Sequence, residues 1–303
     1  MNGAPRFSVL VPTRGRPDLA AACVASVLAQ DHPSFELVLS DQSDDDRTFA
    51  AATAAAAGNP RLTIVRAPGR GRSRALNAGL PACRGAWIVM TDDDCEPEPG
   101  WLLALDREAA RAPERAAIVG RVVPGPVEPG KADPPATLDE PEPRDWRGRV
   151  DRDLVYPNFA IPRAAFAELG RFDVRLGVGT PIPGGEDNDF GYRLLRSGYA
   201  LLYRPGPTVV HRAWRSHEER LALKRAYGVG QGGFYAKHLA RGDAFVAWRL
   251  ARDLFRNARA AGGAAIRGNR TGARGHLAYL SGLGTGLWRM GILLARRAPA
   301  EDR

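Results

Sequence analysis

The chain has 303 residues, of which 44% are hydrophobic and 25% charged, so it can bury a substantial core and has an ordinary globular composition. Its three cysteines are widely spaced, which argues against a disulfide scaffold or a zinc site and favours a reducing cytoplasm. The net charge of +9 is concentrated in residues 204–303, which hold 19 Lys and Arg against 6 Asp and Glu. The first residues show no charged leader before a long apolar stretch, so we expect no signal peptide.

Strand-like and helix-like segments alternate over the first 125 residues. The strands are short and almost continuously apolar, which is typical of a parallel sheet covered on both faces. The predicted strands are 7–13, 35–41, 62–67 and 86–92, and the predicted helices are 17–29, 46–57 and 72–82. This alternation indicates an α/β layered domain, in which ligands bind beyond the carboxyl ends of the strands.

Polar side chains follow three of these strands: Thr13 and Arg14, then Asp41, then three aspartates at 92–94. Adjacent carboxylates at a strand end repel one another, so we expect a cation beside them. Mg²⁺ and Mn²⁺ bind one or two carboxylates and complete their shell with phosphate oxygens and water. The aspartates therefore indicate a metal-held diphosphate, and the alternative is an aspartate-rich surface turn.

A second acidic group follows a glycine and proline loop within 177–198. It occupies the first turn of a predicted helix and consists of Glu186, Asp187 and Asp189. One of these acids can serve as the general base toward an acceptor hydroxyl. The alternative is that they only stabilise the helix dipole as an N-terminal cap.

The stretches on either side of this group are simpler. Residues 124–143 are rich in proline and acid and are expected to form an extended loop, after which apolar residues resume at 153–162. Two short strands are predicted at 200–205 and 208–212. His211, near the end of the second, is either a structural residue or, beside a metal site, a nitrogen ligand.

Five segments, taken in order, resemble the inverting glycosyltransferase family 2. They read "SVLVPTRGRP", "LVLSDQSDDD", "GRSRALNAGL", "VMTDDDCEPEPGWL" and "GGEDNDFGYRLLRSGYALLYRPGPTVVH". The resemblance covers residues 6–212 and implies a GT-A fold with a mixed central sheet. A Rossmann-like nucleotide-sugar half at 1–125 and an acceptor half at 126–213 would form a catalytic domain, followed by a mostly helical region at 214–303.

The resemblance also implies donor-binding residues. In chain order they are Pro12, Thr13, Arg14, Asp41, Arg72, Asn77, Asp92 and Asp93. Asp41 matches the acid that hydrogen-bonds the uracil base in many members, which favours a UDP-sugar. Arg72 and Asn77 match the segment that borders the diphosphate, while Asp92 and Asp93 match positions that face the ribose and the sugar.

For the reaction itself, the resemblance implies a single inverting displacement assisted by Mn²⁺ or Mg²⁺. Asp94 and His211 match the metal ligands, and Asp187 matches the catalytic base. Glu186 is the alternative base or an acceptor contact, and the sequence does not separate the two carboxylates.

The family's processive synthases carry a Q-x-x-R-W sequence, which this chain lacks, so we expect one sugar, of hexosyl or hexosaminyl type, per encounter. The acceptor is expected to be a glycan, a lipid-linked intermediate or a small molecule. Two rival interpretations are a nucleotidyltransferase and a catalytically silent nucleotide-sugar binding module. A nucleotidyltransferase would carry a glycine-rich phosphate loop at the first strand, and this chain has none. A silent binding module would not need the acidic residues and the histidine, all of which this chain has.

The C-terminal region is basic and helical. On a helix over 243–260, arginines lie on one face and apolar residues on another. The arginines are Arg249, Arg252, Arg256 and Arg259, and the apolar residues are Val246, Leu250 and Leu254. Segment 276–297 is apolar but interrupted by glycines and Arg289, which makes it marginal for a spanning helix. These features predict a cytoplasmic protein held at the anionic inner face of the plasma membrane, and not a nucleic-acid partner. The alternative is packing of these helices on the catalytic domain or in a homodimer.

Overall fold

The computed structural model describes residues 3–127, 129–131, 134, 136–151 and 157–296. In this part of the chain, nine strands form one mixed sheet. In neighbouring order they are β3 (Leu62–Arg66), β2 (Phe35–Asp41), β1 (Phe7–Thr13), β4 (Trp87–Thr91), β8 (Asn158–Pro162), β6 (Ala116–Pro124), β9 (Ala200–His211) and β5 (Cys95–Pro97), with β7 (Arg144–Trp146) paired to β9. The α/β class and the mixed sheet predicted above are confirmed.

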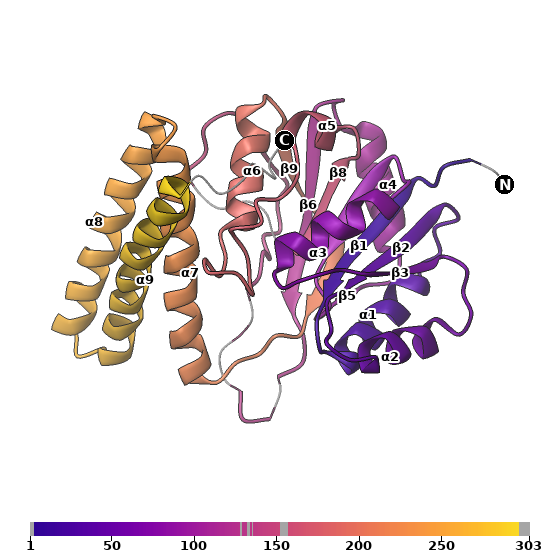
Figure 1. The fold of residues 1–303 in the computed structure, drawn as a ribbon, viewed down its shortest axis with the longest axis horizontal. Coiled ribbons are helices and arrows are strands. Elements are labelled where there is room, and N and C mark those ends of the chain that lie inside the picture. The colour runs from indigo at the N-terminus through magenta and orange to yellow at the C-terminus, as the bar shows by residue number, and fades with distance from the viewer. Residues whose placement is uncertain (1–2, 128, 132–133, 135, 152–156, 297–303) are drawn as a thin grey trace.

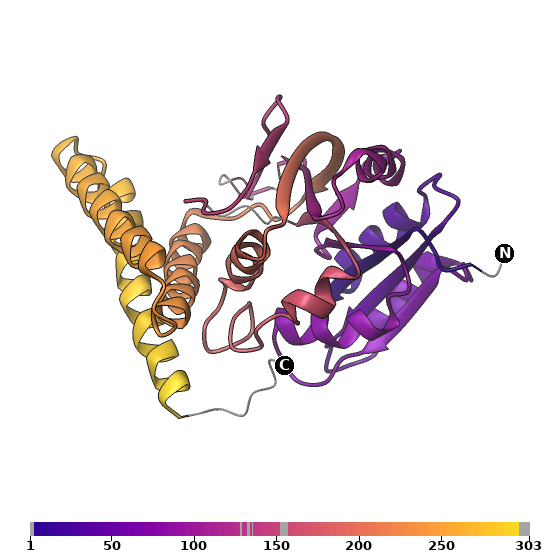
Figure 2. The ribbon, with the colours of Figure 1, turned by 90° about the horizontal axis from the view of Figure 1, so that it is seen from above.

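Helices connect and cover these strands (Figure 1). They are α1 (Pro17–Leu28), α2 (Arg47–Ala56), α3 (Arg72–Gly79), the short 3₁₀ helix η1 (Leu80–Ala82), α4 (Trp101–Arg111), α5 (Ala165–Leu169), α6 (Glu186–Arg196), α7 (His217–Leu239), α8 (Ala244–Ile266) and α9 (Arg270–Ala295). Figures 1 and 2 place α7, α8 and α9 at the end of the molecule opposite the N-terminus.

The first four strands in sequence, β1 to β4, are parallel to one another. Every residue of β1, β2 and β4 is buried, because their apolar side chains meet covering elements on both faces of the sheet. Thr13 at the end of β1 is the register partner of Asp41 at the end of β2. Because the strands are parallel, the polar residues that follow them lie at one edge of the sheet.

Antiparallel pairing begins at β8, which runs against both β4 and β6. Strand β9 lies between β6 and β5, where Cys95 is the register partner of His211. The sequence predicted two strands at 200–205 and 208–212, and this is wrong because they form one strand. Its register against β6 shifts between Gly120 and Arg121, so the irregular backbone is absorbed as a bulge rather than a turn.

Two predicted segments fall partly outside the described residues. Within 124–143, the structure describes all but 128, 132, 133 and 135, and Leu138 forms an isolated bridge with Val122. Within 153–162, the last five residues are β8, while 153–156 are not described.

The glycine loop before α6 packs directly on the backbone of α7. Gly185, the N-cap of α6, has a φ of +84°, a conformation that favours glycine. A Cβ on Gly185 would also lie 2.5 Å from the carbonyl oxygen of Gly230 in α7. Glycine is thus needed at this position for two reasons, its positive φ and its close contact with α7. The contact fixes the start of the acidic helix against the C-terminal region.

The C-terminal helices pack closely through small residues. A Cβ on Gly286 of α9 would lie 2.0 Å from the carbonyl oxygen of Val229 in α7, and one on Gly232 would lie 2.1 Å from that of Leu283. The glycines therefore let two helix backbones approach to contact. Among the described residues, no helix is both long and apolar enough to cross a membrane.

The arginine stripe predicted on 243–260 is not one exposed face. Arg249 is buried, with its guanidinium over the ring of Phe234 and 3.5 Å from Asp151. Leu254, predicted on the packed apolar face, is exposed instead. Helical spacing shows which residues share a face, but an aromatic ring and an acid from elsewhere in the chain bury this arginine.

Candidate active site

Asp93, just beyond the end of β4, is held by Thr13 of β1 and by Arg16, the N-cap of α1. It accepts hydrogen bonds from Thr13 Oγ1 at 2.8 Å and from Arg16 Nη1 at 2.9 Å. Burial raises the pKa of Asp93 to about 6, against the opposing charge of Arg16. Arg16 was not among the predicted residues, although it stands in the same "PTRGRP" segment as Thr13. The two strand ends thus form one charged network.

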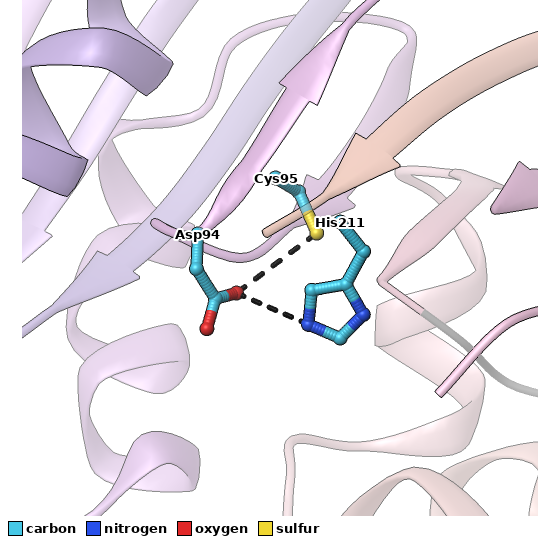
Figure 3. Close-up of side chains that lie close together, drawn as sticks. All are labelled: Asp94, Cys95 and His211. Atoms are coloured by element: carbon cyan, nitrogen blue, oxygen red, sulfur yellow. Dashed lines mark hydrogen bonds and ion pairs between the residues drawn. The ribbon is translucent and has the colours of Figure 1, made fainter. Parts of the chain in front are cut away.

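Asp94 and His211 come together across the junction of β5 and β9 (Figure 3). The distance from Asp94 Oδ1 to His211 Nε2 is 3.5 Å. His211 Nδ1 lies 2.9 Å from the carbonyl oxygen of Ala136, which can only accept a hydrogen bond, so Nδ1 carries the proton. In the neutral ring, Nε2 then presents its lone pair toward Asp94, as a metal-binding histidine requires.

Cys95 completes a group of three potential ligand atoms that lie within 4.8 Å of one another. Burial raises the pKa of the Cys95 thiol well above its usual range, and hard cations such as Mg²⁺ prefer oxygen ligands to sulfur. One carboxylate and one imidazole, with phosphate oxygens and water to complete the shell, fit Mn²⁺ or Mg²⁺. The donor set at Asp94 and His211 is therefore compatible with the predicted divalent cation.

Arg72, the first residue of α3, joins the acids of β4 to those of α6. Its Nε lies 2.9 Å from Asp92 Oδ1, and its Nη1 lies 2.8 Å from Asp187 Oδ1 and 3.4 Å from Glu186 Oε1. These carboxylates raise the pKa of the Arg72 guanidinium although its burial opposes this, so it remains a cation. One largely buried arginine thus draws together the two acidic groups that the sequence placed about ninety residues apart.

The two carboxylates at the start of α6 differ in access. The Glu186 side chain is 6% exposed, whereas that of Asp187 is 30% exposed. Burial and the charge of Asp187 raise the pKa of Glu186 to about 7. Burial also raises the pKa of Asp187, and Arg72 opposes this rise. Asp187 is therefore the carboxylate that a substrate can reach, with a basicity increased above that of an ordinary aspartate.

The third acid of α6, Asp189, faces away from this site. It is buried and lies 3.0 Å from Lys237 Nζ, 2.9 Å from Arg193 Nε and 2.9 Å from His238 Nε2. Lys237 Nζ also lies 2.7 Å from Asp173. The pKa of Asp189 is well below its usual range, because the charges of Lys237 and Arg193 and the hydrogen bond with His238 outweigh the effect of burial. Asp189 therefore holds α6 onto α7.

The remaining donor-side residues are partly occupied by contacts within the protein. Arg14 donates to the backbone of Gln42 and pairs with Asp44 at 2.7 Å. Asp41 is buried, accepts from the N–H of Ser43 and lies 3.2 Å from Arg66. Arg14 and Asp41 are therefore held at the strand ends by these contacts. Pro12 lies at the same edge, as part of β1.

Asn77, predicted to border the diphosphate, makes two hydrogen bonds to the backbone of Phe172. Its side-chain amide donates to the carbonyl oxygen of Phe172 at 2.8 Å and accepts from the N–H of the same residue at 3.0 Å. Both polar atoms of Asn77 thus bind backbone, and its contact fixes the position of α3 against the chain before α6.

Sequence reasoning also missed Tyr227 of α7. Its side chain is half exposed, and partial burial raises its pKa, with Arg215 and Arg220 opposing the rise and the charges of Asp92 and Glu186 adding to it. The predicted helix gave no signal for it, because its position depends on how α7 packs against α6.

The family assignment follows from a comparison with known proteins. A model described as "Glycosyl transferase family 2" matches residues 8–170, more than half of the chain. The chain belongs to this family. The resemblance that its motifs suggested is confirmed, and the mixed sheet is the central sheet of a GT-A fold.

Among curated relatives, a "PGL/p-HBAD biosynthesis glycosyltransferase" of Mycobacterium bovis is 34% identical over 92 residues. The match spans 30% of this chain and 36% of that relative.

Two solved structures share the fold. The mannosyltransferase PcManGT from Pyrobaculum calidifontis, in complex with GDP-Man and Mn²⁺, superposes with a TM-score of 0.63 at 21% identity, over 95% of this chain and 88% of that one. S. aureus TarS in complex with UDP-GlcNAc gives a TM-score of 0.53 at 16% identity, over 91% and 92% of the two chains.

Proposed function

We propose that this family member is a glycosyltransferase that moves one sugar from a nucleotide-diphosphate sugar to an acceptor hydroxyl with inversion. The observation that carries the proposal is the bridge made by Arg72, with Asp92 of the donor edge on one side and Asp187 on the other. A base reachable from solvent thus lies beside the strand ends where a GT-A fold binds its donor.

In the proposed reaction, the acceptor oxygen attacks the anomeric carbon as the bond from that carbon to the diphosphate breaks. The diphosphate leaves with the electron pair, and Asp187 takes the proton of the acceptor hydroxyl. Arg72 keeps Asp187 directed toward the donor edge and Asp93, held by Thr13, lines that edge. Holding donor and acceptor in line is itself a large part of such catalysis.

Asp94 and His211 are the residues that would hold Mn²⁺ or Mg²⁺ in this site. When bound there, the cation neutralises negative charge on the departing diphosphate. PcManGT was solved with Mn²⁺ and GDP-Man, and GalNAc-T7 with Mn²⁺, UDP and GalNAc. These neighbours support a divalent cation, and the choice between the two metals stays a prediction.

We further propose a UDP-sugar donor of hexosyl or hexosaminyl type, on the match of Asp41 to the base-reading acid. Residues 1–125 would bind the donor and 126–213 the acceptor, with 214–303 supporting them. A glycan, lipid-linked or small-molecule acceptor remains the expectation, and transfer would be non-processive. The nucleotidyltransferase and the silent binding module remain less favoured, because neither needs a reachable base at the start of α6.

The test is a panel of UDP-, GDP- and dTDP-sugars, screened by thermal shift with Mn²⁺ and then by release of the nucleoside diphosphate with a mixture of sugar acceptors. We expect one donor class to stabilise the protein and to be turned over. Binding of a donor without turnover on any acceptor would favour the silent module. Release of inorganic diphosphate from a nucleoside triphosphate would favour the nucleotidyltransferase.

A further inference from the structure

The outer side of α8 presents aromatic and aliphatic side chains to solvent together with arginines. At the helical repeat, these residues lie within about 40° of one line along the helix. They are Trp248, Arg252, Phe255, Arg259 and Ile266, here called the α8 outer face. Trp248 is 49% exposed, Phe255 71% and Ile266 88%. Large apolar side chains at such exposure, aligned over most of a helix, mark an interaction surface.

On the outer face Trp248, Phe255 and Ile266 stay exposed and Arg252 pairs with Asp151 at its edge, whereas the opposite side of α8 packs inward. Val246, Asp253 and Asn257 are buried there, and Asp253 accepts a hydrogen bond from Tyr279 of α9 at 2.6 Å. Figures 1 and 2 both place α8 at the end of the molecule, away from the parallel strands. The α8 outer face can therefore meet a partner without covering the active site.

The charge of the two last helices restricts that partner. Residues 244–296 contain nine arginines and a single acid, the buried Asp253. A second copy would bring two such basic surfaces together, which like-charge repulsion disfavours. An anionic partner with an apolar interior fits both features of the face, since arginines attract anionic headgroups and tryptophan prefers the membrane interface.

We propose that the α8 outer face docks the protein onto an anionic lipid bilayer, with Trp248, Phe255 and Ile266 entering the headgroup region. The arrangement at Trp248 suits this role, because Arg252 lies over its ring with the guanidinium carbon 5.4 Å from the ring centre. α9 adds two exposed apolar residues, Leu277 and Trp288. The surface differs from the arginine stripe predicted from sequence, in which Arg249 is buried.

The experiment is flotation of the full chain with vesicles of phosphatidylcholine, alone or mixed with phosphatidylglycerol. Wild type is expected to float with the mixed vesicles at low salt and to be released as salt screens the arginines. The variant Arg259→Gln/Arg274→Gln removes one exposed arginine from α8 and one from α9, and it should bind about 25-fold more weakly, at about five-fold for each arginine. Phe255→Ser/Ile266→Ser should weaken binding by about ten-fold or more, because the apolar anchors are lost.

The matched control is Arg107→Gln/Arg111→Gln, which removes two exposed arginines from α4 and should float like wild type. All variants alter exposed side chains, so their unfolding midpoints and their nucleotide-dependent thermal shifts should be unchanged. This separates the proposal from the proposed function, whose failure would appear in those shifts. Wild type that ignores mixed vesicles at low salt, or α8 variants that float like the control, would overturn the proposal. So would a dimer in solution that Phe255→Ser/Ile266→Ser converts to monomer.

Discussion

The two acidic groups of this protein look alike in sequence and differ in how their charge is balanced. At the start of α6, Asp189 is neutralised from within the chain by Lys237, Arg193 and His238. At the strand ends, Asp94 is contacted by the half-exposed Arg16 at 3.1 Å and by the ring of His211. Asp189 is fully balanced as folded, whereas Asp94 can accept a further cation. An acid in either group is therefore structural or functional according to which cations the fold supplies.

The largest expected effect is a loss of turnover, and it distinguishes Asp187 from Glu186. Asp187→Asn should lower turnover by about 10²–10⁴-fold while donor binding is kept, because an amide cannot take the acceptor proton. Steady-state kinetics and a nucleotide thermal shift on the same preparation measure both quantities. Glu186→Gln is the matched variant and should retain more activity. If Glu186→Gln is inactive and Asp187→Asn is not, the base is Glu186.

Removing a cation that balances Asp189 should lower the stability of the protein rather than its turnover. Lys237→Met should lower the free energy of unfolding by about 3–5 kcal/mol, because Asp173 and Asp189 would remain buried without their shared cation. Urea unfolding followed by circular dichroism measures it. Lys131→Met is the control, since Lys131 pairs with Glu219 at the surface, where such a pair contributes about 1 kcal/mol or less. Equal losses in the two variants would contradict the account.

A smaller effect is expected in the pH dependence of turnover. The base must be ionised, so turnover should rise with pH through the pKa of Asp187, which burial has raised. Arg72 opposes that rise, so Arg72→Met should shift the acid side of the kcat profile to higher pH. Arg72→Lys keeps the charge and should shift it less. An acid limb in the same place in all three proteins would show that Arg72 does not act on the base.

Much of the parallel half could be predicted because its strands are continuous apolar runs. The limits of β1 and β2 match the prediction to the residue, β3 ends one residue earlier than predicted, and β4 is one residue shorter at each end. β9 was divided in the prediction because proline and glycine at 205–207 resemble a turn. Only its pairing with β6 shows that the strand continues.

The sequence predicted which residues belong to the site but not which of their side chains contact one another. The sequence placed Asp94 and His211 in one metal site, and the fold brings them within 3.5 Å, although the role stays a prediction. The residues alone left all three acids of α6 open as the base, and the resemblance left Asp187 and Glu186 unseparated, because neighbouring acids on one helix turn differ only in what faces them. Arg72 and Lys237, which decide the difference, come from distant segments whose approach depends on tertiary packing.

The most direct test of the central claim is the melting temperature of wild type and of Asp94→Asn with UDP, in Mn²⁺ and in a chelator. Saturating UDP with Mn²⁺ should stabilise wild type by about 2.7 kcal/mol at a hundred times the dissociation constant. The shift should be nearly absent in chelator and in Asp94→Asn, because the diphosphate then meets uncompensated carboxylates. Equal shifts with and without metal in wild type would contradict the claim that the strand-end acids are completed by a divalent cation.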